Sequence, residues 1–204
     1  SNNHLLVIAG GSGAGWTLPF IEQFVASHSM VTDEERGEVL PFNNKEANNS
    51  SNSPFSSIHV IVATRDVNSR MWYRQAINQL LLNYSAKASS GVNIQLRLTG
   101  KGAAQTTTPS NGSSSALEHG ITRKGSESES TLPIEELDGR PDLPTTIQKM
   151  ARGMTATDSL GVYVCGPGTM QNDVRNAVAG VNLDILSGSK SGGAYLHCEH
   201  FSWA

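Results

Sequence analysis

A glycine-rich turn near the start of the chain has the residue types of a nucleotide-binding loop. It follows four apolar residues, 5–8, that predict a strand buried on both faces, and Thr17 and Pro19 favour the start of a helix after it. Backbone N–H groups and the positive end of such a helix can bind a pyrophosphate. No Gly-Lys-Ser/Thr ending follows, which excludes a triphosphate-binding lysine, and an ordinary glycine turn between strand and helix remains the alternative. The residues predicted to bind a dinucleotide here are Gly10, Gly11, Ser12, Gly13, Thr17 and Pro19.

Arg65 ends a second predicted strand, 58–65, at the place where doubly wound nucleotide-binding folds contact the adenosine ribose. An acidic residue there favours a free 2′-hydroxyl, whereas the planar guanidinium of arginine suits a 2′-phosphate. Thr64 and Arg65 therefore favour NADPH over NADH. Asp66 follows directly and keeps NADH open, because it could bind a ribose or pair with Arg65.

Cys165 ends a later apolar run, 160–165, and the turn Gly166-Pro167 follows it. A thiol between a strand and a helix start can have a lowered pKa and act as a nucleophile. It can also be a small packing residue, or it can contact a nicotinamide ring. The residues alone leave these three interpretations open.

The elements that must position these residues alternate between strand and helix along the chain. Strands are predicted at 5–8, 58–65, 92–98, 160–165 and 194–201, with a helix capped by Asn68 or Ser69 and another over 145–151. The alternation of apolar and polar residues in 92–98 favours an edge strand with one wet face. This order predicts an α/β fold, a doubly wound parallel five-stranded sheet that forms one domain over 1–204. Two polar, low-complexity insertions interrupt it at about 31–57 and 101–131, and we expect them to be dispensable for folding.

Composition excludes several classes of function. The net charge is −3 and no cluster of lysines and arginines occurs, so we expect no nucleic-acid partner. No run approaches the ~18 apolar residues of a membrane span. The two cysteines, Cys165 and Cys198, are too few for a disulfide framework. His197, Cys198 and His200 lie near Glu199 but form an incomplete ligand set, so no metal site is predicted.

Five motifs occur together in the order seen in one family. They are the loop from Gly10 to Pro19, Arg65 with Trp72, Gly139-Arg140-Pro141, Cys165-Gly166-Pro167, and the ending Glu199-His200-Phe201-Ser202-Trp203. On these motifs the chain resembles the C-terminal NADPH-binding domain of fungal ferric-chelate reductases, which are relatives of the NADPH oxidases and of ferredoxin–NADP reductase. The resemblance covers nearly the whole chain outside the two insertions.

The resemblance implies a role for each matched residue. The first loop would hold the pyrophosphate, Arg65 the 2′-phosphate, and Arg140 with Pro141 another part of the dinucleotide. Cys165 would lie against the nicotinamide carbon that gives up hydride, with Gly166 and Pro167 beside it. Glu199 resembles the family's carboxylate two residues before the aromatic that covers the flavin, which makes Phe201 the stacking residue. Trp203 remains an alternative cover because the chain continues past Phe201.

The same resemblance implies partners outside this sequence. Electrons would pass from NADPH to an FAD held mainly by a flavin domain, then through haem b in a membrane domain to a ferric chelate outside the cell. The domain would then be associated with the membrane through the parent protein and lie on the cytosolic face of the plasma membrane, with no membrane segment of its own. Two alternatives stay open: an oxidase of the same build that reduces oxygen, and a stand-alone nucleotide-binding module without a flavin partner.

Overall fold

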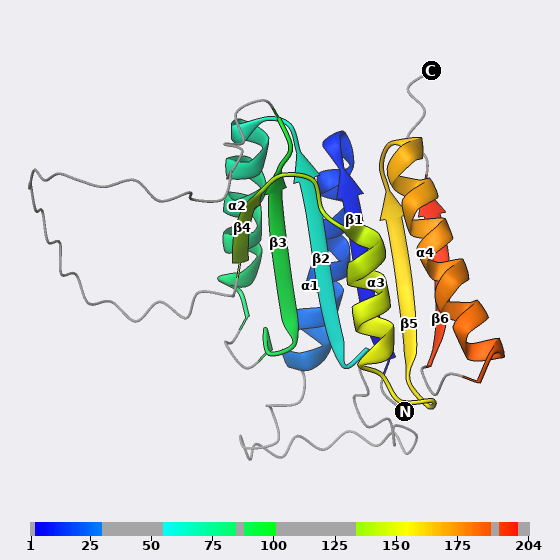
Figure 1. The fold of residues 1–204 in the computed structure, drawn as a ribbon. Helices are drawn as coiled ribbons and strands as arrows, with labels where there is room; N and C mark the ends of the chain where they lie inside the picture. Colours follow the sequence, from blue (N-terminus) through cyan, green and yellow to red (C-terminus); the bar gives the residue numbers. More distant parts are fainter. Residues whose placement is uncertain (1–2, 30–54, 85–87, 101–133, 189–191, 200–204) are drawn as a thin grey trace, which may run out of the picture.

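The protein is built on one parallel sheet of six strands, in the order β4-β3-β2-β1-β5-β6 (Figure 1). The computed structural model describes residues 3–29, 55–84, 88–100, 134–188 and 192–199. Every neighbouring pair of strands in this sheet is parallel. The strands are β1 (Asn3–Gly10), β2 (Ser57–Thr64), β3 (Val92–Leu98), β4 (Ile134–Asp138), β5 (Ser159–Cys165) and β6 (Gly193–Glu199).

Helices cover both faces of the sheet, as a doubly wound fold requires. In the described residues they are the short 3₁₀ helix η1 (Gly11–Thr17) and the α-helices α1 (Leu18–Ser29), α2 (Val67–Leu81), α3 (Leu143–Arg152) and α4 (Gly168–Leu186). The helices α1 and α2 pack on one face, and α3 and α4 pack on the other (Figure 1). The predicted α/β architecture is confirmed.

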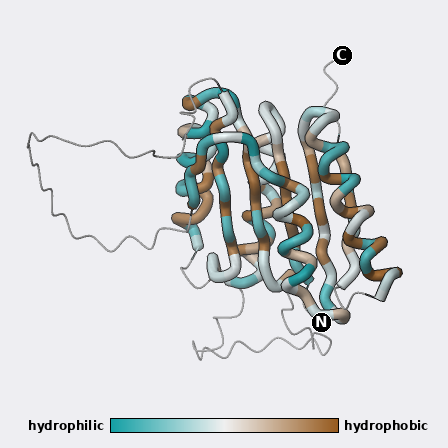
Figure 2. Tube along the Cα trace, viewed as in Figure 1, coloured by the Kyte–Doolittle hydropathy of each residue, from teal (hydrophilic) through white to brown (hydrophobic). Residues whose placement is uncertain are grey.

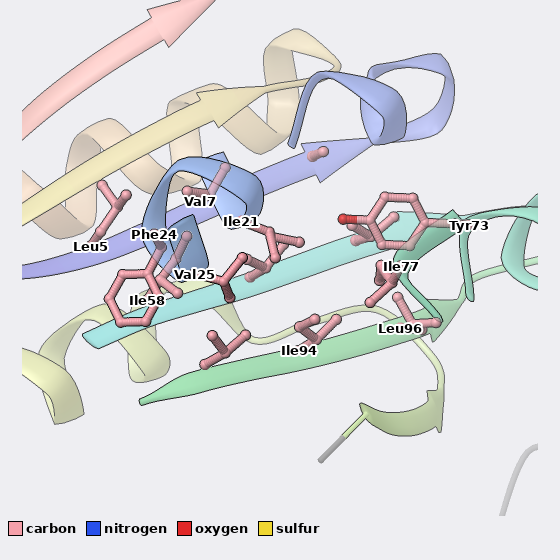
Figure 3. Packing of buried hydrophobic residues seen from close by; sticks show 14 of the residues in the cluster. Leu5, Val7, Ile21, Phe24, Val25, Ile58, Tyr73, Ile77, Ile94 and Leu96 are labelled. Atoms are coloured by element: carbon pink, nitrogen blue, oxygen red, sulfur yellow. The ribbon is translucent and has the colours of Figure 1, made fainter. Parts of the chain in front are cut away.

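Alternation along the strands divides the core into two layers. Leu5 and Val7 of β1 point to the α1–α2 side, where they join Phe24 and Tyr73, and Figure 3 shows this layer. Leu6 and Ile8 point to the other side and join the cluster under α3 and α4. Figure 2 shows the consequence on α4, where hydrophobic and hydrophilic residues alternate along the helix because one side packs on the sheet.

The strand count and one strand position differ from the sequence prediction. The sixth strand is β4, which we did not predict, and it lies at the edge beyond β3. The strand over 92–98 is therefore an interior strand and not an edge strand. Its alternating pattern has another cause: Ile94 and Leu96 are buried under α2, whereas Asn93 and Gln95 face the side that α3 leaves partly open.

The first insertion ends earlier in the chain than predicted. We placed its limit at residue 57, but β2 already begins at Ser57, and Ser56 donates a backbone hydrogen bond of 2.7 Å to Asn3 O. Residues 31–54 of this insertion and the whole of the second insertion, 101–131, lie outside the described residues. None of the described helices combines the length and hydrophobicity needed to cross a bilayer.

The order of the strands reverses direction between β1 and β5. From β1 the chain runs outward through β2 and β3 to β4, and it then returns to place β5 on the other side of β1. Ligands of open α/β sheets bind at the carboxyl ends of the strands beside such a reversal. Both glycine turns follow the two strands at this point, after Gly10 and after Cys165.

Candidate nucleotide-binding site

The two glycine turns touch one another at the reversal of the sheet. A side chain at Gly166 would place its Cβ 3.3 Å from the backbone nitrogen of Gly10 and 2.8 Å from the Met170 sulfur. A Cβ at Gly10 would lie 3.0 Å from Pro167 and Met170. Glycine at both positions lets the turns approach each other this closely, because a Cβ at either one would force Met170 or the neighbouring turn to shift.

The first turn leaves backbone N–H groups available for an anion. The chain passes from Gly10 straight into η1, and Gly10, the N-cap residue, has no side chain that could cap this helix. Gly11 has a φ of 63°, and a Cβ built on it would meet nothing within 4 Å. Ser12 beside it is exposed. These residues thus form an open, donor-rich turn that fits the pyrophosphate of a dinucleotide.

Thr17 has a role different from the predicted one. It does not cap a helix, because its hydroxyl donates to Ala14 O at 2.7 Å and also binds the Tyr73 hydroxyl. Both Thr17 and Tyr73 are fully buried, so Thr17 fastens η1 to α2 and does not face the turn's open side. Pro19 is exposed and is the second residue of α1, which agrees with its predicted place in the first turn.

Arg65 projects from a firmly held strand end. The carbonyl of the buried Thr64 accepts hydrogen bonds from the backbone and the hydroxyl of Thr99, at 2.7 and 3.0 Å. Gly100 packs so closely on the Arg65 carbonyl that a Cβ would lie 2.3 Å from it. The side chain of Arg65 is exposed and forms no ion pair with any described residue. Its guanidinium is therefore free to bind an anion beside the sheet.

Asp66 is occupied by the helix that follows. Its carboxylate accepts the backbone N–H of Ser69 at 2.9 Å and the Ser69 hydroxyl at 3.1 Å, which makes it the N-cap of α2. The backbone hydrogen bond from Ser69 is the main reason that the pKa of Asp66 lies below its ordinary value. The sequence predicted Asn68 or Ser69 as this cap, so the prediction was wrong by two or three residues. Because Asp66 caps α2, it does not pair with Arg65.

Arg140 reaches the start of α4 from the loop after β4. Gly139 turns the chain there with a φ of 88°, and the buried Pro141 follows. The Arg140 guanidinium donates to the Thr169 hydroxyl at 3.3 Å, in the first turn of α4. The N-cap residue of this helix, Pro167, makes no side-chain cap hydrogen bond. The second glycine turn thus has an uncapped helix N-terminus with a cation beside it.

Cys165 is a buried thiol at the base of the site. It is 1% exposed, and a Cβ at Gly13 would lie 3.0 Å from its sulfur, so η1 covers it closely. Burial raises the pKa of the Cys165 thiol, and the negative charge of Glu199 raises it further. This environment argues against a thiolate nucleophile, because such residues need a lowered pKa.

Glu199 lies beside Cys165 at the end of β6. The two residues are partners in the β5–β6 register, so their side chains share the α1 face of the sheet. The carboxylate of Glu199 is partly exposed and contacts His197 Nε2 at 2.7 Å. The His197 ring in turn lies 5.3 Å from the ring of Tyr163. These contacts hold an acid next to the thiol at the carboxyl edge.

Some predicted residues cannot be placed in this site. Phe201 and Trp203, the two candidate flavin covers, lie outside the described residues. Among the described residues, no three potential metal ligands gather in one place. A groove of about 580 Å³ lies between α3 and the polar face of β2 and β3 and contains none of the predicted site residues.

Gln171, a fully buried amide in the first turns of α4, was not predicted from the sequence. A single glutamine in an amphipathic helix gives no signal that distinguishes it from a surface residue. Trp72 was noted only as part of the resemblance, and its ring lies over η1, 3.7 Å from a Cβ built at Gly15.

Fold and site together define a dinucleotide-binding α/β domain with its ligand site at the reversal between β1 and β5. The sequence profile of the ferric reductase NAD binding domain matches residues 2–179, so the chain belongs to this family. Its fold is accordingly that of the ferredoxin–NADP reductase-like nucleotide-binding domains, and its cofactor is a nicotinamide dinucleotide. A search of curated proteins gave no match.

Proposed function

We propose that this chain is the NADPH-binding domain of a transmembrane flavocytochrome that reduces ferric chelates. NADPH would supply a hydride to FAD and leave as NADP⁺. The two electrons would then pass one at a time through haem b to two ferric ions. The fungal subtype of the family and the cytosolic placement of the domain are part of the same proposal.

The observation that carries the proposal is the meeting of Cys165 and Glu199 beside the two glycine turns. The register pairs these residues at the carboxyl edge, and the closest packing of the turns is at the same edge. A nicotinamide ring placed against Cys165 would have a buried, uncharged sulfur on one side. The pyrophosphate would then lie over the open turn at Gly11. Arg140, which contacts Thr169 at the start of α4, would lie near it.

The choice of NADPH rests on Arg65. A 2′-phosphate needs a cation with no competing acid, and the only acid adjacent in sequence, Asp66, caps α2. The described residues that hold Thr64 and Arg65 in place are Thr99 and Gly100, and both act on the backbone, which leaves the guanidinium free. Arginine suits this task because its planar fork can bind two phosphate oxygens at once.

The proposal is tested with the parent flavoprotein in membranes. We expect NADPH to reduce the flavin in a single turnover and NADH to do so far more slowly. With a ferric chelate present, ferrous iron should appear at two ions per NADPH consumed. Oxygen consumption with no iron reduction would instead identify an oxidase, and no flavin reduction by either dinucleotide would favour a stand-alone module.

A further inference from the structure

The side chain of Gln171 joins the two strand ends that carry Cys165 and Glu199. It is 1% exposed, and its amide nitrogen donates to Gly166 O at 2.9 Å and to Glu199 O at 3.0 Å. A side-chain amide has two N–H hydrogens, so one group can make both bonds. A single buried residue therefore connects the second glycine turn to the end of β6.

These two carbonyls are placed where small shifts matter for the site. Gly166 directly follows Cys165, and Glu199 bears the carboxylate whose charge acts on the Cys165 thiol. β6 is one of the two edge strands of the described sheet and pairs only with β5. The end of such a strand is the part most free to move, since one neighbour holds it instead of two. Gln171 supplies the missing constraint from α4.

We infer that Gln171 is a positioning residue for hydride transfer, which holds Glu199 and the end of β6 in place against Cys165. This inference rests on the proposed function. Gln171 would touch neither the dinucleotide nor the flavin and would act through the two backbone carbonyls it binds. Its loss should therefore change the rate of the chemical step more than the affinity for NADPH.

The same helix and strand contain a matched control at their other end. Asn182 of α4 donates to Ala194 O at 3.0 Å and accepts from Ala194 N at 3.1 Å. Each of the two residues thus makes two side-chain hydrogen bonds and connects α4 to β6, Gln171 through Glu199 O and Asn182 through Ala194. They are separated by 11 residues, roughly 16 Å along the helix. Substitution of either residue would weaken the contact between α4 and β6, but only substitution of Gln171 would change the site.

The experiment compares Gln171→Met with Asn182→Leu, each close to the original side chain in size but without its polar atoms. In the parent flavoprotein, single-turnover flavin reduction should slow about tenfold in Gln171→Met, and the Kd for NADPH should change less than about twofold. Asn182→Leu should keep the wild-type rate of flavin reduction. Gln171→Glu keeps the length of the side chain but lacks both N–H donors when ionised, so it should slow flavin reduction in the same way. It replaces Gln171→Met in the comparison if that variant does not fold.

A second measurement needs no flavin and uses the chain itself. The alkylation rate of Cys165, followed by mass spectrometry of its peptide, should rise several-fold in Gln171→Met and stay unchanged in Asn182→Leu. Equal effects of both substitutions on flavin reduction and on alkylation would overturn the inference. If wild-type protein fails to reduce flavin with NADPH, the proposed function fails, and the alkylation comparison still decides whether Gln171 holds the Cys165 turn.

Discussion

The exposed guanidinium of Arg65 makes a specific prediction about cofactor choice. Arg65→Ala should weaken NADPH binding by about 1.5–3 kcal/mol, the range for a hydrogen bond to a charged group, because it removes the donor to the 2′-phosphate. NADH binding should not change, since NADH has no such phosphate. Titration with both dinucleotides measures this. Arg152→Ala, a substitution of an exposed arginine at the far end of α3, is the control and should leave both affinities unchanged. Equal losses for NADPH and NADH would remove Arg65 from its assigned role.

The buried thiol of Cys165 predicts slow alkylation and a rate of hydride transfer that depends on this side chain. Because burial and the Glu199 charge raise the pKa of the thiol, the thiolate is scarce at neutral pH, and alkylation should become fast only in alkaline solution. Cys165→Ser and Cys165→Ala should keep the fold and most of the NADPH affinity but slow flavin reduction, by as much as ~100-fold. Stopped-flow reduction and the pH profile of alkylation are the measurements. Unchanged reduction rates in both variants, or rapid alkylation near pH 7, would contradict this assignment.

At the scale of the elements, the contact between Thr17 and Tyr73 decides how η1 is fixed to α2. Thr17 donates its own proton to Ala14 O, so the Tyr73 hydroxyl donates to Thr17, and burial raises the pKa of Tyr73. Thr17→Val leaves a buried hydroxyl without an acceptor and should lower the free energy of unfolding by about 1–3 kcal/mol. Tyr73→Phe removes that hydroxyl and should cost less, about 0.5–1.5 kcal/mol.

Urea unfolding of both variants and of the double variant measures this contact. The double variant should lose less free energy of unfolding than the sum of the losses in the two single variants, because removing both partners leaves no unpaired group. A Thr17→Val protein as stable as Tyr73→Phe would show that the buried hydroxyl finds another acceptor.

The elements that the sequence predicted well are those whose signals are local. The apolar runs of β1, β2 and β5 and the glycines after them gave the parallel sheet and both turns of the site. β4 was missed because Ile134–Asp138 contains three acids in five residues, a composition typical of a solvated segment. Arg70 and Arg74 of α2 offset those charges, with ion pairs to Glu136 and Asp138 at 3.0–3.8 Å. These arginines lie over 60 residues away in the chain, so no local pattern reveals the pairing.

Tertiary contacts explain the errors in the site as well. Thr17 has the residue type of a helix cap, but η1 continues the backbone through it and Tyr73 binds its hydroxyl in the core. The role of Gln171 depends on two carbonyls in segments that are 5 and 28 residues away. The positions of Arg65, Cys165 and Glu199 could be predicted because each lies at the end of a strand or directly after it, and strand ends meet at one edge in any parallel sheet.

For the whole molecule, the parallel pairing of β3 with β4 requires a connection that runs back along the sheet. Leu98 pairs with Asp138 and Ile94 with Ile134, so the chain leaves β3 at the carboxyl edge and enters β4 near the other end. The offset is four residues, roughly 13 Å of strand. Parallel neighbours generally need a crossover of about a dozen residues or more. The segment 101–131 therefore supplies necessary length, whether or not its particular residues are needed.

Two replacements of this segment separate length from sequence. A Gly–Ser linker of about 14 residues in place of 101–131 should shift the Tm by no more than ~3 °C, because loop closure depends only weakly on length. Joining Gly100 directly to Leu132 leaves three peptide steps to Ile134, which span at most ~11 Å. β4 should then separate from β3, and the ion pairs of Arg70 and Arg74 should be lost with it.

Thermal unfolding measures the stability of both replacements, and amide hydrogen exchange at Leu96 and Leu98 shows whether β4 still pairs with β3. A cooperative loss of stability with the long linker would show that residues within 101–131 contribute contacts of their own, and stable β4 pairing after the direct fusion would contradict the crossover argument.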